Sequence, residues 1–302
     1  MSHSGRSVGL SLMGNSLAGV AGTAAALYPI NGTPAVVGFL RLSIGAATLL
    51  ILSPFFGGKL RKLPRLMLRP GVWVMAITSA SYQALFFASV QLAGVAAAAL
   101  VTVGCIPVAA GLVGWLVLKE RPTAMWLFAT TLAVSGLAIR SAGELHTSNG
   151  SGLLLAVGAG TGIGGYLTAA KIEIRHGGHP MQLPGMAYFL GSLCLLPIIH
   201  TSLLQVEWTP QTIWLCVFLG VITMGLANAF QILGLHGISP GVAATMMLAD
   251  PVTATVLGLV VMHETLTSMG AVGLALVVLG LLLQSFTSSA PKVPRGRHRL
   301  AA

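Results

Sequence analysis

The chain of 302 residues carries too few charges for a water-soluble globule. Lys, Arg, Asp and Glu make up 7% of it, against about 25% in a soluble domain. Hydrophobic residues make up 55%, and the mean hydropathy is +0.88. Because disorder requires low hydrophobicity and high charge, a disordered chain is excluded as well. We attribute the net charge of +10 to loops retained on the cytoplasmic side of a membrane, and expect no nucleic-acid partner.

Ten segments are apolar and long enough to cross the hydrocarbon core of a bilayer, which takes about 20 helical residues. They are continuously apolar and do not alternate, which disfavours a β-barrel. The fold class expected is therefore an all-α polytopic membrane protein. The predicted spans are 8–28, 33–54, 70–91, 94–118, 122–141, 151–173, 181–201, 210–235, 240–262 and 266–287.

Basic residues indicate the orientation of these spans. With a cytoplasmic N-terminus, 14 of the 16 Lys and Arg residues fall on the cytoplasmic side, Arg140 falls outside and Arg41 lies within a span. Lys and Arg are enriched in cytoplasmic loops, so we expect both termini in the cytoplasm. Removing the first segment as a signal peptide would spoil this bias, so we expect it to be a retained helix.

Two stretches of the chain repeat at an offset of 144 residues. The matching pairs are Pro107 and Pro251, Gly114 and Gly258, Glu120 and Glu264, and Gly136 and Gly280. We therefore expect a five-helix repeat at 1–141, a linker at 142–150, a second repeat at 151–287 and a basic cytoplasmic tail at 288–302. Five is odd, so the second repeat enters the membrane inverted, as in many secondary transporters.

The repeated residues resemble the EamA domain of the drug/metabolite transporter superfamily. The resemblance rests on Gly-Trp-Leu-Val-Leu-Lys-Glu-Arg-Pro-Thr at 114–123, its second copy within 250–280, and Phe-Leu-Arg-Leu at 39–42. It covers about residues 8–287 and implies ten helices in a basket-like arrangement that exports small metabolites. Within the superfamily the chain looks similar to the YddG-type amino-acid exporters of bacterial inner membranes. One departure is that the second repeat has no Arg matching Arg41.

Two charged residues lie deep inside predicted spans, away from the span ends, where a charge costs about 2.5–3.5 kcal/mol on insertion scales. Arg41 is a candidate for attracting a substrate carboxylate; the alternative is a structural bond to helix-end carbonyls, to Asp250 or to a lipid headgroup. Asp250 is a candidate for a protonatable group that links export to the proton gradient. Its alternative is a fixed cap at a helix break, and uncoupled transport stays open.

Other residues in the spans are candidates for lining a substrate cavity or for bending helices. A pocket with aromatic walls and a few amides suits a zwitterion with an apolar side chain. Pro107 and Pro251 are hinge candidates, because a proline removes a helix hydrogen bond. The cavity candidates, beside Arg41 and Asp250, are Asn15, Tyr82, Gln83, Phe86, Tyr166, Asn228 and Gln231.

The sequence favours a transporter over two other classes of protein. A membrane-embedded enzyme would need acidic, His or Cys residues clustered at depth, and only Asp250 is present; a non-transporting assembly protein is the third class. We expect no catalytic residues, metal or cofactor. The expected partners are the bilayer and a small molecule, amino acids first, with drugs and nucleosides as alternatives and protons as a further option. Ten helices suffice for a monomer.

Overall fold

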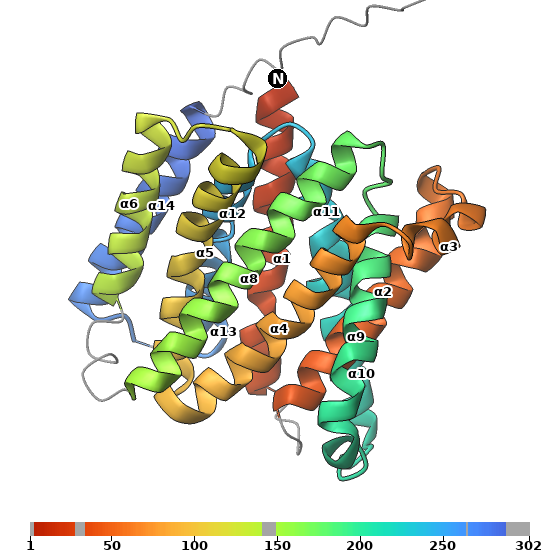
Figure 1. Ribbon diagram of the computed structural model, residues 1–302. Helices are drawn as coiled ribbons and strands as arrows, with labels where there is room; N and C mark the ends of the chain where they lie inside the picture. The colour runs from red at the N-terminus through yellow and green to blue at the C-terminus, as the bar shows by residue number, and fades with distance from the viewer. Residues whose placement is uncertain (1–2, 28–33, 141–148, 264, 288–302) are drawn as a thin grey trace, which may run out of the picture.

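The computed structural model describes residues 3–27, 34–140, 149–263 and 265–287, and the regular elements in these ranges are all helical (Figure 1). The linker expected at 142–150, apart from its last two residues, and the expected tail at 288–302 lie outside the described residues. The helices are α1 (His3–Leu27), α2 (Pro34–Leu52), η1 (Ser53–Phe56), η2 (Leu60–Lys62), α3 (Leu63–Leu66), α4 (Pro70–Ala93), α5 (Val95–Leu118), α6 (Ala124–Arg140), α8 (Gly150–Arg175), α9 (Gln182–Leu203), α10 (Pro210–Phe218), η3 (Leu219–Leu226), α11 (Ala227–Leu235), α12 (Pro240–Met246), α13 (Ala249–Val261) and α14 (Ser268–Thr287).

Eight helical stretches of the described chain are long and apolar enough to cross a membrane. A ninth, Ala124–Ile139, is apolar but shorter. Helix α1 is 25 residues long and is not among the eight; its sequence includes serines, a threonine and Asn15. The all-helical membrane fold is thus confirmed, while the count of ten spans stays a prediction.

Two of the predicted spans are not uniform α-helices. Span 210–235 contains a π-helical turn, η3, between α10 and α11. Span 240–262 breaks between α12 and α13, four residues before Pro251. A proline ring clashes with the carbonyl four residues earlier, here that of Met247, which explains the position of the break. Helix α5, in contrast, continues through Pro107.

The two halves of the chain make reciprocal contacts. Helix α6 lies beside α14 (Figure 1), and a Cβ on Gly136 would lie 2.5 Å from the carbonyl oxygen of Gly273. A Cβ on Gly280 would lie 2.7 Å from the carbonyl oxygen of Ala129. The offset of 144 relates Gly136 to Gly280 and Ala129 to Gly273, so each contact is the counterpart of the other, as across a two-fold axis.

Backbone conformation repeats at the same offset. Among the described residues, only Lys119 and His263 combine a side chain with a positive φ, at 58° and 54°. Lys119 follows α5, and His263 comes two residues after the end of α13; α5 ends at the top of Figure 1 whereas α13 ends at the bottom. Equivalent helices therefore run in opposite directions through the bundle.

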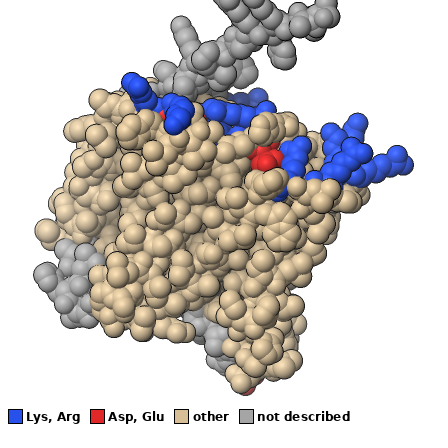
Figure 2. Space-filling model, viewed as in Figure 1, with Lys and Arg blue, Asp and Glu red and all other residues tan. Residues whose placement is uncertain are grey.

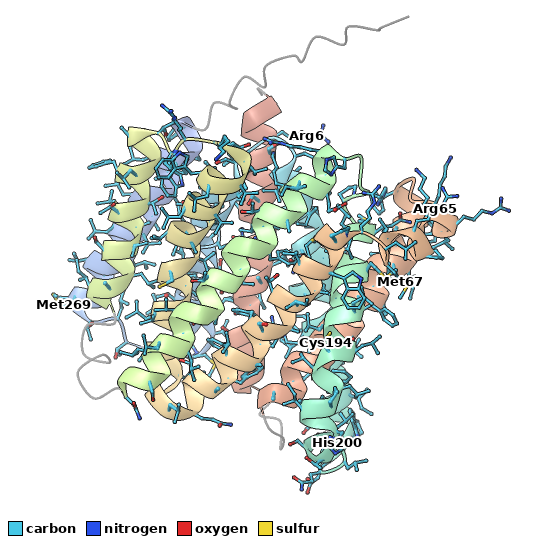
Figure 3. The ribbon with its side chains drawn as sticks, viewed as in Figure 1. Arg6, Arg65, Met67, Cys194, His200 and Met269 are labelled. Carbon is cyan, nitrogen blue, oxygen red and sulfur yellow. The ribbon has the colours of Figure 1, made fainter. Side chains whose placement is uncertain are left out.

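Lys and Arg side chains gather at the end of the bundle where α5 and α8 end, which we call the basic end (Figure 2). Arg6 and Arg65 lie there, whereas His200 lies at the opposite end (Figure 3). On the visible face, the sides of the bundle between the two ends show almost no charge (Figure 2). This distribution is typical of a protein whose sides contact lipid.

Candidate functional site

A cavity of about 120 Å³ lies between the two halves of the chain. Residues of α1, α2 and α4 line it from the first half, and residues of α8, α9, η3, α11 and α13 line it from the second. Close helix packing brings these elements together; for example, a Cβ on Gly19 of α1 would lie 2.5 Å from the carbonyl oxygen of Asp250. The cavity is therefore a product of both halves.

Arg41 enters the cavity from α2. Its Nη2 donates a hydrogen bond to Oγ1 of Thr223 at 3.3 Å, while its Nε is buried without a hydrogen-bond partner. A buried donor that lacks a partner is costly, especially on a charged group. The guanidinium thus keeps unused capacity for a carboxylate, which Arg can bind through two parallel hydrogen bonds.

Asp250 lines the same cavity from the first turn of α13, next to the break that Pro251 causes. It forms no ion pair with Arg41, because the ion pairs of the described residues are Arg69–Glu173 and Glu120–Arg175. A cation and a carboxylate therefore face one cavity without direct contact. This arrangement offers opposite charges to a single ligand.

Three polar side chains form a hydrogen-bonded chain across the cavity wall. The hydroxyl of Tyr166 donates to that of Tyr188 at 3.1 Å, and the hydroxyl of Tyr188 donates to Oδ1 of Asn228 at 2.5 Å. The two tyrosine rings stack with their centroids 5.8 Å apart. Because both rings are buried, this chain gives the cavity a fixed aromatic wall.

Amide side chains line another part of the cavity. Nε2 of Gln231 donates to Oδ1 of Asn15 at 3.2 Å, and Nδ2 of Asn15 donates to the backbone oxygen of Ser11 at 2.7 Å. Nε2 of Gln83 donates to the backbone oxygen of Gly38 at 3.1 Å. Each of these bonds uses one amide N–H, and no described residue donates to the Oε1 atom of either glutamine, so both oxygens can accept a hydrogen bond from a ligand.

The structure brings eight of the nine cavity candidates together. Asn15, Arg41, Tyr82, Gln83, Tyr166, Asn228, Gln231 and Asp250 line the cavity. Phe86 does not line it; its ring instead stacks on Tyr82 at 5.8 Å, because it lies one helical turn further along α4. Sequence reasoning missed Tyr188, Ser79, Thr223, Met224 and Met247. Tyr188 carried the same signal as Tyr166, a tyrosine within an apolar span.

Two ion pairs join the halves at the basic end. Arg69, which precedes α4, donates to Oε2 of Glu173 on α8 at 2.8 Å. Arg175 pairs with Glu120, which follows α5. Glu173 is only 7% exposed, so water screens this pair less than a surface pair. Separating the halves at this end would break both pairs.

A buried lysine holds the turn between α11 and α12 beside these pairs. Nζ of Lys171 donates to the backbone oxygens of Leu235, His236 and Ile238 at 2.5, 3.1 and 2.8 Å. A cation at the last carbonyls of a helix also interacts favourably with its dipole. Partial burial lowers the pKa of His236 in this turn, and the charges of Lys171 and His179 lower it further.

The fold and the cavity define a multi-pass helical membrane protein with a polar chamber between two related halves. Comparison with known proteins identifies its family: the model of the EamA-like transporter family matches residues 7–142 and 150–286. The chain belongs to this family and is a membrane transporter. This confirms the family that the sequence motifs indicated.

Individual relatives agree with this assignment. The chain is 31% identical over 283 residues to an uncharacterized transporter, YwfM, of Bacillus subtilis, covering 93% of this chain and 94% of that protein. It is 31% identical over 122 residues to a WAT1-related protein of Arabidopsis thaliana, covering 39% of this chain and 35% of that one. A solved crystal structure shares the fold, with a TM-score of 0.79 at 19% identity, covering 93% and 98%.

Proposed function

We propose that the chain is a secondary transporter that exports amino acids, aromatic and hydrophobic ones first, by alternating access. The observation that carries this proposal is the pair Arg41 and Asp250, which face one cavity from opposite halves without pairing to each other. A zwitterion satisfies both, with its carboxylate on Arg41 and its ammonium group toward Asp250. Tyr82, Tyr166 and Tyr188 supply aromatic walls for an apolar side chain.

The two-fold relation of the halves supports alternating access. Inverted repeats that rock about a site between them expose the site to each side in turn. In the described arrangement, Arg69–Glu173 and Glu120–Arg175 link the halves at the basic end. We place this end in the cytoplasm and the chain in the bacterial inner membrane, with both termini cytoplasmic. We propose that these pairs separate when substrate enters, and that one chain forms the complete pathway.

Counterflow into proteoliposomes tests this proposal. We expect radiolabelled tyrosine or phenylalanine to be exchanged, and tyramine, which lacks the carboxylate, and 4-hydroxyphenylpropionate, which lacks the ammonium group, to compete weakly. Arg41→Gln is expected to weaken competition by tyrosine about 10- to 150-fold, since a hydrogen bond to a charged group contributes about 1.5–3 kcal/mol. It should leave competition by tyramine nearly unchanged.

Lys62→Gln is the matched control, because Lys62 is an exposed cation outside the cavity lining. Equal competition by tyrosine and tyramine would contradict zwitterion recognition, and no exchange of any amino acid by folded protein would contradict amino-acid transport. Asp250→Asn tests proton coupling. The variant also loses the contact with the ammonium group, so exchange should fall; if the carboxylate carries the proton as well, the remaining exchange no longer depends on the pH gradient.

A further inference from the structure

We propose that an anionic phospholipid binds in a groove between α5 and α6, with its phosphate on Arg121 and an acyl chain along the groove. This site is separate from the transport cavity and does not depend on the identity of the transported substrate. The groove has a volume of about 590 Å³. Its apolar walls include Val108 and Leu112 on α5 and Leu127 on α6, and all three side chains are exposed.

The groove exists because consecutive helices pack against different partners. Helix α5 packs mainly against α8, and α6 packs mainly against α14. The floor between them is the ring of Trp126, which is buried against Gly111 and Gly241. The groove ends where α5 and α6 come into contact, since a Cβ on Gly104 of α5 would lie 3.7 Å from Cγ1 of Val134 of α6.

The length of the groove matches one leaflet of a bilayer. It begins at Arg121, at the basic end, and extends along α6 as far as Val134 and Ser135. The rise from residue 124 to residue 134 of a helix is about 15 Å, which is half of a hydrocarbon core about 30 Å thick. An acyl chain of the leaflet at the basic end therefore fits the groove from the headgroup region to the midplane.

The groove carries a cation at one end and mainly apolar side chains beyond it, interspersed with the hydroxyl groups of Thr130, Thr131 and Ser135. The exposed guanidinium of Arg121 forms no ion pair with a described carboxylate, and a guanidinium matches the geometry of a phosphate. Trp115, also near the basic end, has an exposed indole whose N–H donates to no described residue, and Trp is typical of the membrane interface. Basic pockets between membrane helices on the cytoplasmic side bind anionic headgroups.

A second copy of the chain fits the groove less well. A helix from a partner that crosses the bilayer would need an apolar surface along the whole hydrocarbon core, whereas this groove closes at half that depth. Its cation at one end requires a complementary anion at that level. A phospholipid supplies both features in one molecule.

Tryptophan quenching tests the proposal, because two of the five tryptophans of the chain line the groove. In the variant W73F/W208F/W214F, only Trp115 and Trp126 fluoresce. The protein is reconstituted into phosphatidylcholine vesicles that contain a minor fraction of a brominated lipid. In one preparation this lipid is phosphatidylglycerol, and in the other it is phosphatidylcholine with the same brominated chains. From the quenching, we expect brominated phosphatidylglycerol to bind near these tryptophans about fivefold more strongly than brominated phosphatidylcholine. This ratio corresponds to the ~1 kcal/mol that one basic residue contributes at a membrane surface.

Variants separate the site from general surface charge. In the same background, Arg121→Gln should reduce the preference to about one, while Arg61→Gln, which removes an exposed cation of the basic end, should preserve it. Thr131→Phe fills the groove and keeps Arg121, and it should also reduce the preference. The proposal would be overturned by equal quenching by both lipids, or by retention of the preference in Arg121→Gln. It would also be overturned if neither lipid quenched because a second copy covers the groove.

Discussion

Neutralising Glu173 should make the cavity easier to reach from the basic end. Its ion pair with Arg69 links the two halves, with 2.8 Å between Nη1 of Arg69 and Oε2 of Glu173. The side chain of Glu173 is 7% exposed, and that of Arg69 is 37% exposed. Removing one partner of a fully buried ion pair destabilises a protein by about 3–5 kcal/mol, whereas an exposed ion pair contributes about 0.2–1 kcal/mol. Because one side chain of this pair is buried and the other is partly exposed, we expect its loss to destabilise the closed state by about 1–2 kcal/mol. This change raises the ratio of open to closed molecules about 5- to 30-fold.

Thiol labelling of a cavity residue measures this shift. Leu167 lines the cavity on α8, below Glu173, and Leu167→Cys is introduced after Cys105, Cys194 and Cys216 have been replaced. In inside-out vesicles, the labelling rate of this cysteine should rise about 5- to 30-fold with Glu173→Gln. Lys62→Gln, which removes a charge from the same end, should leave the rate unchanged.

A double-mutant cycle isolates the pair from other effects of the substitution. If the pair is the restraint, Arg69→Gln raises the labelling rate as well, and the double variant adds little to either single one. Rates that are unchanged in Glu173→Gln, in protein that retains its fold, would refute the reasoning. Additive effects would show that the two residues act independently.

Three further predictions concern packing, the cavity wall and the broken helix. Gly136→Leu and Gly280→Leu should each destabilise the protein by about 1–3 kcal/mol in thermal unfolding, because each residue packs closely on a backbone oxygen of the other half; Gly22→Ala, with open space around it, should not. Tyr188→Phe, which removes the hydroxyl that links Tyr166 to Asn228, should weaken binding by about 0.5–1.5 kcal/mol in equilibrium titration; an unchanged affinity would show that this hydroxyl has no part in binding. Pro251→Ala should restore the helix across Met247 and slow exchange; unchanged exchange rates would exclude a hinge role.

Composition and spacing predict most of the membrane architecture. Apolar runs separated by charges predict where helices begin and end, because lipid requires every backbone group to be bonded within a helix. The predicted fourth span, 94–118, matches α5 (Val95–Leu118) within one residue. The offset of 144 predicted a repeat whose structural counterparts are the glycine contacts of α6 and α14 and the positive φ angles of Lys119 and His263.

Polar residues in apolar spans also predict most of the cavity. A charge or amide is costly in lipid, so it is expected to face the protein interior, and Arg41 and Asp250 do so. The same rule extends to Tyr188, whose hydroxyl lies within an apolar span. For aromatic side chains the sequence is less informative: Tyr82 and Phe86 lie one turn apart on one face of α4, and only Tyr82 lines the cavity, because that depends on the tertiary packing of each turn.

The irregular helices depend on tertiary contacts that local sequence does not reveal. Pro107 and Pro251 are equivalent in the repeat, yet only the second accompanies a break. The π-helical turn η3 contains no proline, and its glycines pack against α2, where a Cβ on Gly225 would lie 2.8 Å from Cγ2 of Thr48. Because η3 places Thr223 in the cavity beside Arg41, the feature hardest to predict lies at the site itself.

The inversion of the two halves is tested most directly by labelling Lys119 and His263, the equivalent positions of the repeat. Each is replaced by cysteine in a chain without other cysteines, and intact cells are treated with a thiol reagent that does not cross the membrane. Cysteine at 263 should react in intact cells, and cysteine at 119 only after the cells are permeabilised. Reaction of both from the same side would contradict inverted halves and, with them, alternating access through the cavity.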